Sequence, residues 1–406
     1  MMDDSVLKKA AEKYGTPLYV YDKAIIDRQC DAFKKAFKGL PWEFGIRYAF
    51  KANTNPEILS IIRSHGFGGD IVSIGELEAG LNAGFKPKDL VYTSNSKSRE
   101  ELARALAAGV CITHGNIMEC EILNEIAKER GVVANVAFRV NPDVDAKTHP
   151  KISTGLKGSK FGLHFERNLA FNAFKFAKDL ENINPVGLHC HIGSQITDMS
   201  GFADAAGKLI DFAQKLDKEL GVRLDFLDFG GGLGVSYDGR PVVGVEEFAG
   251  EYKKILADEG GKLSYRPNAF FEPGRYLVAE SGVLLTKVNS IKETPYKKFV
   301  NVDSGFNTLV RPVMYDAYHP VRVVGKTGGD ITYDIAGNLC ESGDILAKER
   351  NLPKVEVNDI IEIGLAGAYG YSMSSNYNSK PKPAEVLVDG GKIKLIRKRQ
   401  DLRDVI

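Results

Sequence analysis

Short apolar segments alternate with longer amphipathic segments along most of the chain. The apolar segments have the length of buried β-strands, and several segments between them repeat their apolar residues with a helical period. Eight such strands with their helices occupy about 225 residues, close to the ~250 residues typical of a (β/α)8 barrel. An open doubly wound sheet shows the same alternation and remains an alternative. The predicted strands are 46–50, 69–73, 89–94, 110–113, 133–140, 184–190, 223–228 and 267–271, and helical patterns include 57–64, 74–83, 98–108 and 202–219.

The pattern changes after Gly282, where apolar runs become short and turn residues separate them. Few helical patterns remain, so this part predicts a second, antiparallel β domain. Before the barrel, the pattern predicts a strand over 17–21 and an amphipathic helix over 23–37. The strands predicted in the second domain are 283–291, 299–302, 321–324, 331–334, 360–363 and 385–388.

Composition narrows the class of partner. The chain has 406 residues, and its 54 basic and 53 acidic side chains give a net charge of +1. This balance provides no electrostatic footprint for nucleic acid or an anionic membrane, so a small molecule or a second copy of the chain is the expected partner. The segment from Met1 to Ala10 has acids and no apolar core, unlike a secretory signal, and no stretch approaches the ~20 apolar residues of a membrane helix. Five scattered cysteines without a Cys-x-x-Cys pair predict a reduced, cytoplasmic protein.

Polar or glycine-rich clusters follow four of the predicted barrel strands. Lys51 ends the first strand, and the other clusters are 187–195, 228–234 and 271–275 after the sixth, seventh and eighth strands. Functional groups of barrel enzymes collect at the carboxyl ends of the strands. These clusters therefore predict one site at that end of the barrel.

The glycines at 230–232 are a candidate phosphate cradle, because residues without Cβ let backbone N–H groups approach an anion. They do not fit Gly-x-Gly-x-x-Gly, since Val235 stands at its last position, and Pro320 excludes a P-loop before Gly325-Lys-Thr327. A tight turn is the simpler reading. Their place after the seventh strand, beside the eighth-strand loop, favours a phosphorylated ligand.

His189 and His191 stand two apart at the end of the sixth predicted strand. On that basis they are expected to face opposite sides and not to bind one metal, so no metal site is predicted. His191, nearer the strand end, is better placed to meet a ligand. A lysine, a phosphate cradle, a histidine and the carboxylate of Glu272 together suggest pyridoxal 5'-phosphate. The lysine would form a Schiff base and the acid would keep the pyridine nitrogen protonated.

Several motifs resemble the fold-type III pyridoxal-phosphate enzymes, a group that includes alanine racemase and ornithine decarboxylase. The resemblance is greatest to the diaminopimelate decarboxylase family and runs from about Pro17 to Val388. The motifs are Tyr48-Ala-Phe-Lys-Ala-Asn, Arg139-Val-Asn-Pro142, Thr148-His149, Ser153-Thr-Gly155, Ser159-Lys-Phe-Gly162, His191-Ile-Gly-Ser, the triple glycine, Glu272-Pro-Gly-Arg, Arg311-Pro-Val-Met-Tyr315-Asp-Ala-Tyr-His319, Cys340-Glu-Ser-Gly-Asp344, Gly367-Ala-Tyr369 and Asn376-Tyr-Asn378.

The resemblance implies a role for each matching residue. Lys51 would bind the cofactor, His191 would stack on its ring and Glu272 would meet the pyridine nitrogen. Cys340 of the partner subunit would donate a proton. The phosphate would be held by Ser194, Gly231, Gly232, Gly274 and Arg275, with Tyr369 closing it, and the distal end of the substrate would be bound by Arg275, Arg311, Tyr315, Glu341 and Tyr369.

The implied activity is decarboxylation of meso-2,6-diaminopimelate to L-lysine, the last step of lysine biosynthesis, in a homodimer with shared active sites. The implied domains are a cofactor-binding barrel over 31–282 and a β domain formed by 1–30 and 283–406. Two stretches depart from the family pattern, Thr93-Ser-Asn-Ser-Lys97 and 111–116, and they could alter the floor of the site.

The nearest alternative is a decarboxylase of the same fold that acts on ornithine or lysine. Its substrate has no distal carboxylate and therefore has no use for the arginines, so Arg311 with Glu341 favours an amino-acid terminus. A racemase needs a second base opposite Lys51, and no convincing tyrosine is found. A pyridoxal-phosphate carrier without turnover would lack the second domain, and a barrel glycosidase using Glu272 is a remote alternative.

Overall fold

The alternating segments after residue 43 form a closed barrel in the computed structural model, which describes residues 2–146 and 148–406. Eight of the described strands pair in parallel, and pairing of β5 with β6 closes the ring. The (β/α)8 prediction is therefore confirmed, and the open sheet is excluded. The barrel strands are β2 (Phe44–Ala49), β3 (Gly68–Ile71), β4 (Leu90–Tyr92), β5 (Cys111–His114), β6 (Ala134–Asn141), β8 (Ile183–His189), β9 (Phe226–Asp228) and β10 (Asn268–Phe271).

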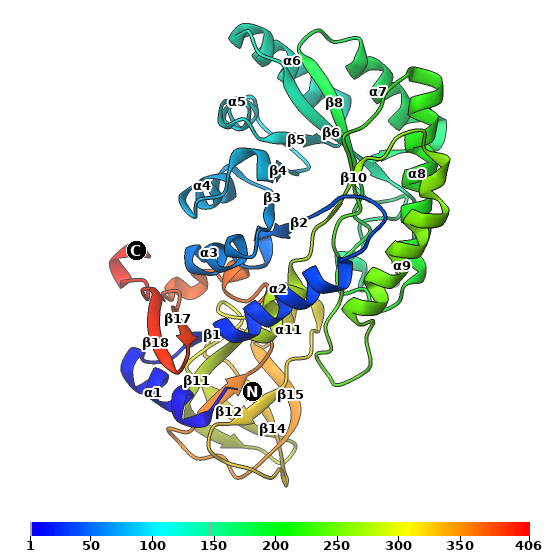
Figure 1. The fold of residues 1–406 in the computed structure, drawn as a ribbon. Coiled ribbons are helices and arrows are strands. Elements are labelled where there is room, and N and C mark those ends of the chain that lie inside the picture. The colour runs from blue at the N-terminus through cyan, green and yellow to red at the C-terminus, as the bar shows by residue number, and fades with distance from the viewer. Residues whose placement is uncertain (1, 147) are drawn as a thin grey trace. The chain divides into compact units, whose positions relative to one another are not determined.

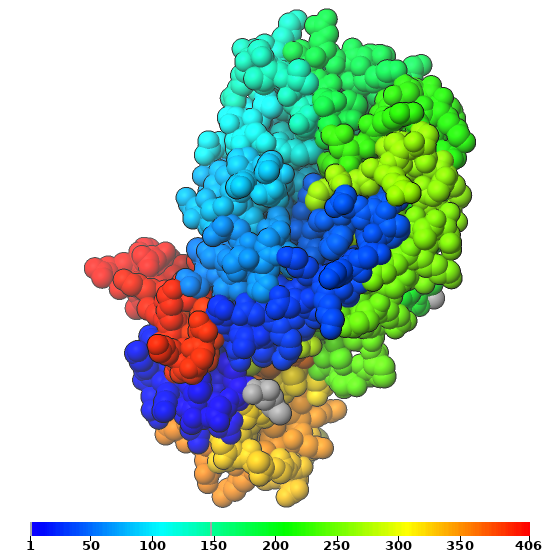
Figure 2. Space-filling model, in the orientation of Figure 1, coloured from blue at the N-terminus to red at the C-terminus, as the bar shows by residue number. Residues whose placement is uncertain are grey.

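Helices lie around the outside of the barrel strands (Figure 1). Each strand before β10 is followed by a helix, and each predicted helical segment falls on one of them. In the same orientation, blue, cyan and green segments form much of the surface drawn in Figure 2. The helices are α3 (Pro56–Ser64), α4 (Ile74–Asn82), α5 (Arg99–Ala108), α6 (Ile117–Arg130), α7 (Leu169–Lys178), α8 (Ser200–Leu220) and α9 (Val245–Asp258), and the two-residue strand β7 (Leu163–His164) pairs with β6.

Local sequence signals set where these helices begin and end. The Ser98 side chain accepts a hydrogen bond from the Glu101 N–H, and the Glu101 carboxylate accepts one from the Ser98 N–H, which forms a capping box. Gly109 ends the same helix in the left-handed conformation, with φ of 78°. Such caps fix the strand-to-helix connections, and these connections carry the candidate site residues.

The interior of the barrel contains a buried ion pair between aromatic rings. Arg47 Nη1 donates a hydrogen bond to Asp228 Oδ2 at 2.8 Å, and both side chains are buried. The Arg47 guanidinium lies 3.6 Å from the ring centroid of Phe270 and 4.5 Å from that of Phe226. A Cβ on Gly187 would lie 2.2 Å from the Phe226 ring, so only glycine fits there. This packing leaves the carboxyl end of the barrel as the place for polar groups.

A second unit contains residues 1–29, 236–241 and 275–406, while the barrel unit contains 30–235 and 242–274. The domain boundaries implied by the resemblance, 31–282 and the remainder, stay a prediction. Helix α2 (Lys23–Phe37) joins β1 to β2, and its bounds match the predicted 23–37. The helices of the second unit are α1 (Asp4–Tyr14), α10 (Arg275–Val278) and α11 (Arg311–Tyr315).

The sheet of the second unit is mixed rather than purely antiparallel. Most neighbouring strands are antiparallel, but β1 pairs with β17 and β12 with β14 in parallel. All predicted strands of this domain are present, and β15 and β18 were not predicted. The strands are β1 (Leu18–Asp22), β11 (Gly282–Glu293), β12 (Lys298–Val302), β13 (Val321–Val323), β14 (Ile331–Ala336), β15 (Ile345–Leu352), β16 (Ile360–Ile363), β17 (Ala384–Asp389) and β18 (Lys392–Arg397).

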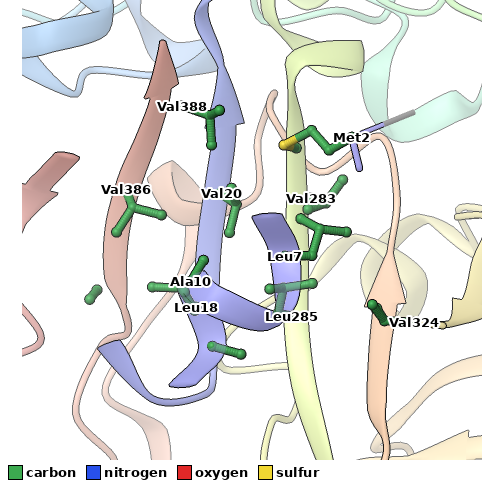
Figure 3. Packing of buried hydrophobic residues seen from close by; sticks show 12 residues of the cluster. Met2, Leu7, Ala10, Leu18, Val20, Val283, Leu285, Val324, Val386 and Val388 are labelled. Carbon is green, nitrogen blue, oxygen red and sulfur yellow. The ribbon is translucent and has the colours of Figure 1, made fainter. Parts of the chain in front are cut away.

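Helix α1 covers one face of this sheet (Figure 3). Its buried residues are Leu7, Ala10 and Ala11, and they pack against strands β1, β11 and β17 through side chains such as Val20 and Leu285. The Asp3 side chain caps the helix by accepting from the Ser5 N–H. The first residues therefore contribute to the core of the β unit.

Replacing Leu7 with alanine should lower the free energy of unfolding by ~2–5 kcal/mol, because it deletes a fully buried side chain from this core. Urea unfolding followed by circular dichroism measures the change, with Lys9→Ala on the exposed side of the same helix as the control. Equal stability of both variants and the native chain would contradict a structural role for α1.

Candidate active site

Lys51 lies directly after β2, in a 3-10 turn formed by Phe50–Ala52. Its Nζ donates a hydrogen bond to Asp70 Oδ2 at 2.5 Å, and Asp70 is fully buried on the neighbouring strand β3. Sequence reasoning did not identify Asp70. The available signal was an acid inside a short buried strand. This ion pair holds the lysine amine at the carboxyl end of the barrel.

His189 ends β8, His191 lies in the loop that follows, and both reach this end of the barrel, so the expectation that they face opposite sides is wrong. His189 Nε2 lies 3.2 Å from Glu272 Oε2, and His191 Nδ1 accepts from the Gly231 N–H at 3.2 Å. Residues two apart in an extended strand face the same side, so the alternation did not support that expectation, and β8 already ends at His189. Burial holds the pKa of His191 well below its usual value, and the charge of Arg139 acts in the same direction. The imidazole is therefore neutral at physiological pH.

The glycine turn after β9 packs between the loops that follow β8 and β10. A Cβ on Gly231 would lie 2.0 Å from the Glu272 carbonyl oxygen. Gly232 has φ of +118°, and a Cβ there would lie 2.6 Å from the Gly193 carbonyl oxygen. Its own carbonyl accepts from the Ile196 N–H at 2.9 Å. Three loops can approach backbone to backbone because glycine occupies these positions.

The loop after β10 also contacts the lysine turn. The Ala49 N–H donates to the Pro273 carbonyl at 3.2 Å. A Cβ on Gly274 would lie 3.0 Å from Ala49 Cβ and 3.2 Å from Ala52 Cβ. Ser194, in the β8 loop, has its carbonyl oxygen bonded by the Thr148 hydroxyl at 2.7 Å. The candidate residues Lys51, His191, Ser194, Gly231, Gly232, Glu272 and Gly274 all belong to the loops that follow β2, β8, β9 and β10.

Glu272 is buried, and its surroundings raise the pKa of its carboxyl group. Burial raises this pKa to about 8, and the charge of Asp70 adds to the increase. Lys51 and Arg139 act in the opposite direction. Glu272 Oε1 is buried and has no hydrogen-bond partner among residues 2–146 and 148–406. One oxygen of the carboxyl group is thus bound to His189, and the other is available to a ligand.

His189, Asp228 and Glu272 offer ligand-type atoms that lie within 4.8 Å of one another, all buried. All three already have partners, since Asp228 accepts from Arg47 and Glu272 is hydrogen-bonded to His189. Burial raises the pKa of Asp228 to about 6 and lowers that of His189 to about 4. We interpret the group as a hydrogen-bonded support for Glu272.

In the β unit, two predicted arginines meet around a tyrosine that sequence reasoning missed. Arg275 Nη1 donates to the Tyr237 hydroxyl at 2.8 Å, and Arg311 Cζ lies 4.6 Å from the centre of the Tyr237 ring. Arg275 Cζ also lies 4.8 Å from the ring of Tyr369. Tyr315, on α11, is close enough to influence both arginines electrostatically. These residues form a cationic cluster with an aromatic lining.

Cys340 and Glu341 lie elsewhere on the β unit and are exposed. Glu341 Oε2 accepts from the Tyr377 hydroxyl at 2.9 Å, and the Cys340 N–H donates to Asn378 Oδ1 at 3.2 Å. Neither is hydrogen-bonded to Arg275 or Arg311 within the described part of the chain. The expectation that Cys340 and Glu341 serve the site of a partner subunit stays a prediction.

Comparison with known proteins gives the family. Residues 23–279 match the family described as "Pyridoxal-dependent decarboxylase, pyridoxal binding domain". The diaminopimelate decarboxylase of Archaeoglobus fulgidus is 45% identical over 394 residues, which cover 97% of this chain and 92% of the relative. That of Methanocaldococcus jannaschii is 42% identical over 402 residues and covers 98% and 91%. The chain belongs to the diaminopimelate decarboxylase family.

Solved structures of this family have the same fold. The diaminopimelate decarboxylase of Helicobacter pylori complexed with L-lysine has a TM-score of 0.92 at 39% identity, covering 98% of each chain. The M. jannaschii enzyme in co-complex with L-lysine has a TM-score of 0.93 at 41% identity, covering 99% of this chain and 93% of that chain. A lysine/ornithine decarboxylase of Vibrio vulnificus has a TM-score of 0.82 at 23% identity and shares the fold.

Pyridoxal phosphate is the cofactor of this diaminopimelate decarboxylase family member, and the barrel residues fit its chemistry. A lysine amine at a strand end suits its aldehyde, and the buried, unpaired Glu272 Oε1 suits a protonated ring nitrogen. The glycine turn lets backbone groups approach a phosphate. Asp70 and His189 extend the predicted set, because they hold Lys51 and Glu272.

The two segments that depart from the diaminopimelate decarboxylase pattern bond to each other. Lys97 Nζ, fully buried, donates to the Thr113 carbonyl at 2.7 Å and to Glu119 Oε2 at 2.9 Å. His114 Nδ1 lies 3.3 Å from the same carboxylate oxygen. Lys97 thus ties the loop after β4 to strand β5 and helix α6. An effect of these segments on substrate choice remains a prediction.

In the cofactor-free protein, Glu272→Gln should stabilise the fold more at pH 8 than at pH 5. A carboxyl whose pKa rises from its usual value to about 8 on folding loses stability as pH rises through that window, because the unfolded chain releases the proton first. Glutamine does not titrate, so the difference in free energy of unfolding should grow with pH. Chemical denaturation at the two pH values measures it, and a difference independent of pH would show that Glu272 is ionised throughout.

Proposed function

We propose that this enzyme is a carboxy-lyase that decarboxylates meso-2,6-diaminopimelate to L-lysine, the last step of lysine biosynthesis. The observation that carries the proposal is identity of 40–45% to several diaminopimelate decarboxylases over 97–98% of this chain. Relatives at this level include enzymes crystallised with L-lysine, the product of the proposed reaction. The reaction removes one carboxylate and puts a proton in its place.

Pyridoxal phosphate, when bound, supplies an electron sink for the negative charge left by the departing carboxylate. Lys51 would attach the cofactor, His191 would lie against its ring, and Glu272 Oε1 would bind the ring nitrogen. Asp70 orients the Lys51 amine, and His189 holds the other Glu272 oxygen. The phosphate would be bound by Ser194, Gly231, Gly232, Gly274, Arg275 and Tyr369.

The distal end of diaminopimelate carries both a carboxylate and an amine. Arg275, Arg311 and Tyr315 would bind the carboxylate, and Glu341 and Tyr369 would complete the binding of this end. Arg311 is 5% exposed, its hydrogen-bond partner is His319, and it forms no ion pair with an acidic side chain of the described residues. A buried guanidinium without a carboxylate partner favours an anionic ligand. A decarboxylase for ornithine or lysine would instead bind a bare amine.

We propose a homodimer in which Cys340 of the partner subunit donates the proton from its Sγ and Glu341 of the partner subunit contacts the distal amine. Support comes from exposed apolar side chains near this segment. Val313 and Met314 are 41% and 40% exposed on α11, and Val313 lies beside Gly343.

The five cysteines are free, which supports the predicted cytoplasmic location. No described helix is both long and apolar enough to cross a membrane.

The function is tested by carbon dioxide release from an amino-acid panel. Purified holoenzyme should release carbon dioxide from meso-diaminopimelate at least about 100-fold faster, per kcat/KM, than from ornithine or lysine, because one missing charged contact costs ~2–3 kcal/mol. Faster turnover of ornithine would reject the proposal in favour of the amine-type decarboxylase.

Arg311→Ala should lower kcat/KM for diaminopimelate by about 100-fold or more, because truncating one partner of a buried charge pair costs ~2–5 kcal/mol. A slow side reaction with ornithine should change little, since its distal end has no carboxylate. Arg403→Ala, at an 87% exposed side chain, is the control. An equal loss with every substrate would remove Arg311 from substrate recognition.

Mixing Lys51→Ala with Cys340→Ala should restore activity if each site draws these residues from two subunits. Random reassociation of a two-fold dimer makes half the molecules mixed. Each mixed dimer then has one site with both lesions and one with neither, so activity should return to about a quarter of the native level. If Cys340 served its own subunit, every site would keep a lesion, and exchanged dimers would stay inactive.

A further inference from the structure

Tyr237 contacts both arginines of the cationic cluster with different parts of its side chain. Its hydroxyl oxygen accepts from Arg275 Nη1 at 2.8 Å, and its ring centroid lies 4.6 Å from Arg311 Cζ. It belongs to the segment 236–241, which packs within the β unit although it follows the glycine turn in sequence. One half-buried tyrosine therefore sets the spacing of two buried guanidinium groups.

His319 holds Arg311 from another direction. Its Nε2 lies 2.8 Å from Arg311 Nη1, and its Nδ1 lies 2.8 Å from the Gly364 carbonyl oxygen. A guanidinium only donates, so Nε2 must accept, and the proton must sit on Nδ1 and be donated to Gly364. These partners assign one neutral tautomer to a fully buried ring. Burial, reinforced by the charge of Arg311, lowers the pKa of His319 to about 3, consistent with this assignment.

The acceptors that Tyr237 and His319 offer to the two arginines are neutral. Arg275 and Arg311 repel each other, and their positive charges need partners when buried. A carboxylate as the acceptor would orient an arginine but would also cancel its charge. The Tyr237 hydroxyl and His319 Nε2 accept hydrogen bonds without supplying a negative charge. Tyr237 and His319 therefore orient the arginines without cancelling their charge.

We propose that Tyr237 and His319 are positioning residues that fix Arg275 and Arg311 as a receptor for the distal carboxylate and thereby select substrates that carry one. The choice of ligand rests on the proposed function. The contacts predict different roles for the two residues. Tyr237 sets the distance between the two guanidinium groups, and His319 fixes the orientation of Arg311. Loss of either should reduce affinity for a distal carboxylate without reducing affinity for a bare amine.

The experiment compares L-lysine with cadaverine, which has the same chain and amines but no carboxylate. Isothermal titration calorimetry on the holoenzyme gives the dissociation constant of each. Tyr237→Phe should raise the dissociation constant of L-lysine by about 10-fold or more, because a hydrogen bond to a charged group is lost. The dissociation constant of cadaverine should change less than about twofold. KM for diaminopimelate should rise similarly, with kcat within about threefold.

His319 is tested with two variants. His319→Leu removes the acceptor for Arg311 and should weaken L-lysine by about 10- to 100-fold, with cadaverine unchanged. His319→Gln keeps a side-chain oxygen that can accept from Arg311 and should recover part of that loss. Tyr333→Phe, at a buried tyrosine on β14 with no described contact to either arginine, is the control and should bind both ligands normally.

Equal weakening of both ligands by Tyr237→Phe would overturn the inference, because it would show general loss of packing. Unchanged L-lysine binding would overturn it as well. If His319→Leu does not fold, Tyr237→Phe and His319→Gln still decide. The native enzyme separates this inference from the proposed function: lack of carbon dioxide release from diaminopimelate rejects the function, while the L-lysine and cadaverine affinities still test the positioning role.

Discussion

Buried carboxyl groups at the end of the barrel need positive charges beside them, and the barrel part of the site depends on this constraint. Three buried acids stand close to three cations, so the formal charges balance. The balance is imperfect at Glu272, where burial outweighs the cations and raises the pKa of the carboxyl group to about 8. The acids are Asp70, Asp228 and Glu272, and the cations are Lys51, Arg47 and Arg139. A positively charged ligand group, such as a protonated pyridine nitrogen, would stabilise the ionised form of the Glu272 carboxyl.

The cationic cluster of the β unit follows the opposite rule. There two buried guanidinium groups are oriented by Tyr237 and His319, which are neutral. In the barrel, the hydrogen-bonded carboxyl of Glu272 is suited to a positively charged ligand group. In the β unit, the hydrogen-bonded guanidinium groups of Arg275 and Arg311 are suited to a negatively charged one. The two clusters are therefore suited to ligand groups of opposite charge, a protonated ring nitrogen in the barrel and a carboxylate in the β unit.

Much of this organisation could be read from the sequence. The alternation of apolar and amphipathic segments predicted the barrel, and strand ends located Lys51, the glycine turn and Glu272. Asp70 and His189 were missed because their importance comes from neighbours on other strands, which periodicity does not reveal. The same is true of Tyr237, which contacts residues far along the chain. Strand β15 carries the run Lys348-Glu-Arg350, which hid its pattern, and the parallel pairing of β1 with β17 depends on partners more than 360 residues apart.

The central claim is that Lys51 carries the cofactor, and borohydride reduction followed by peptide mapping tests it most directly. Reduction fixes the cofactor to the lysine that holds it, and mass spectrometry then locates the added mass. The account predicts the label on the peptide that contains Lys51 and no label in Lys51→Ala. Label on Lys97, the buried lysine in the loop after β4, or on any other lysine would contradict the account.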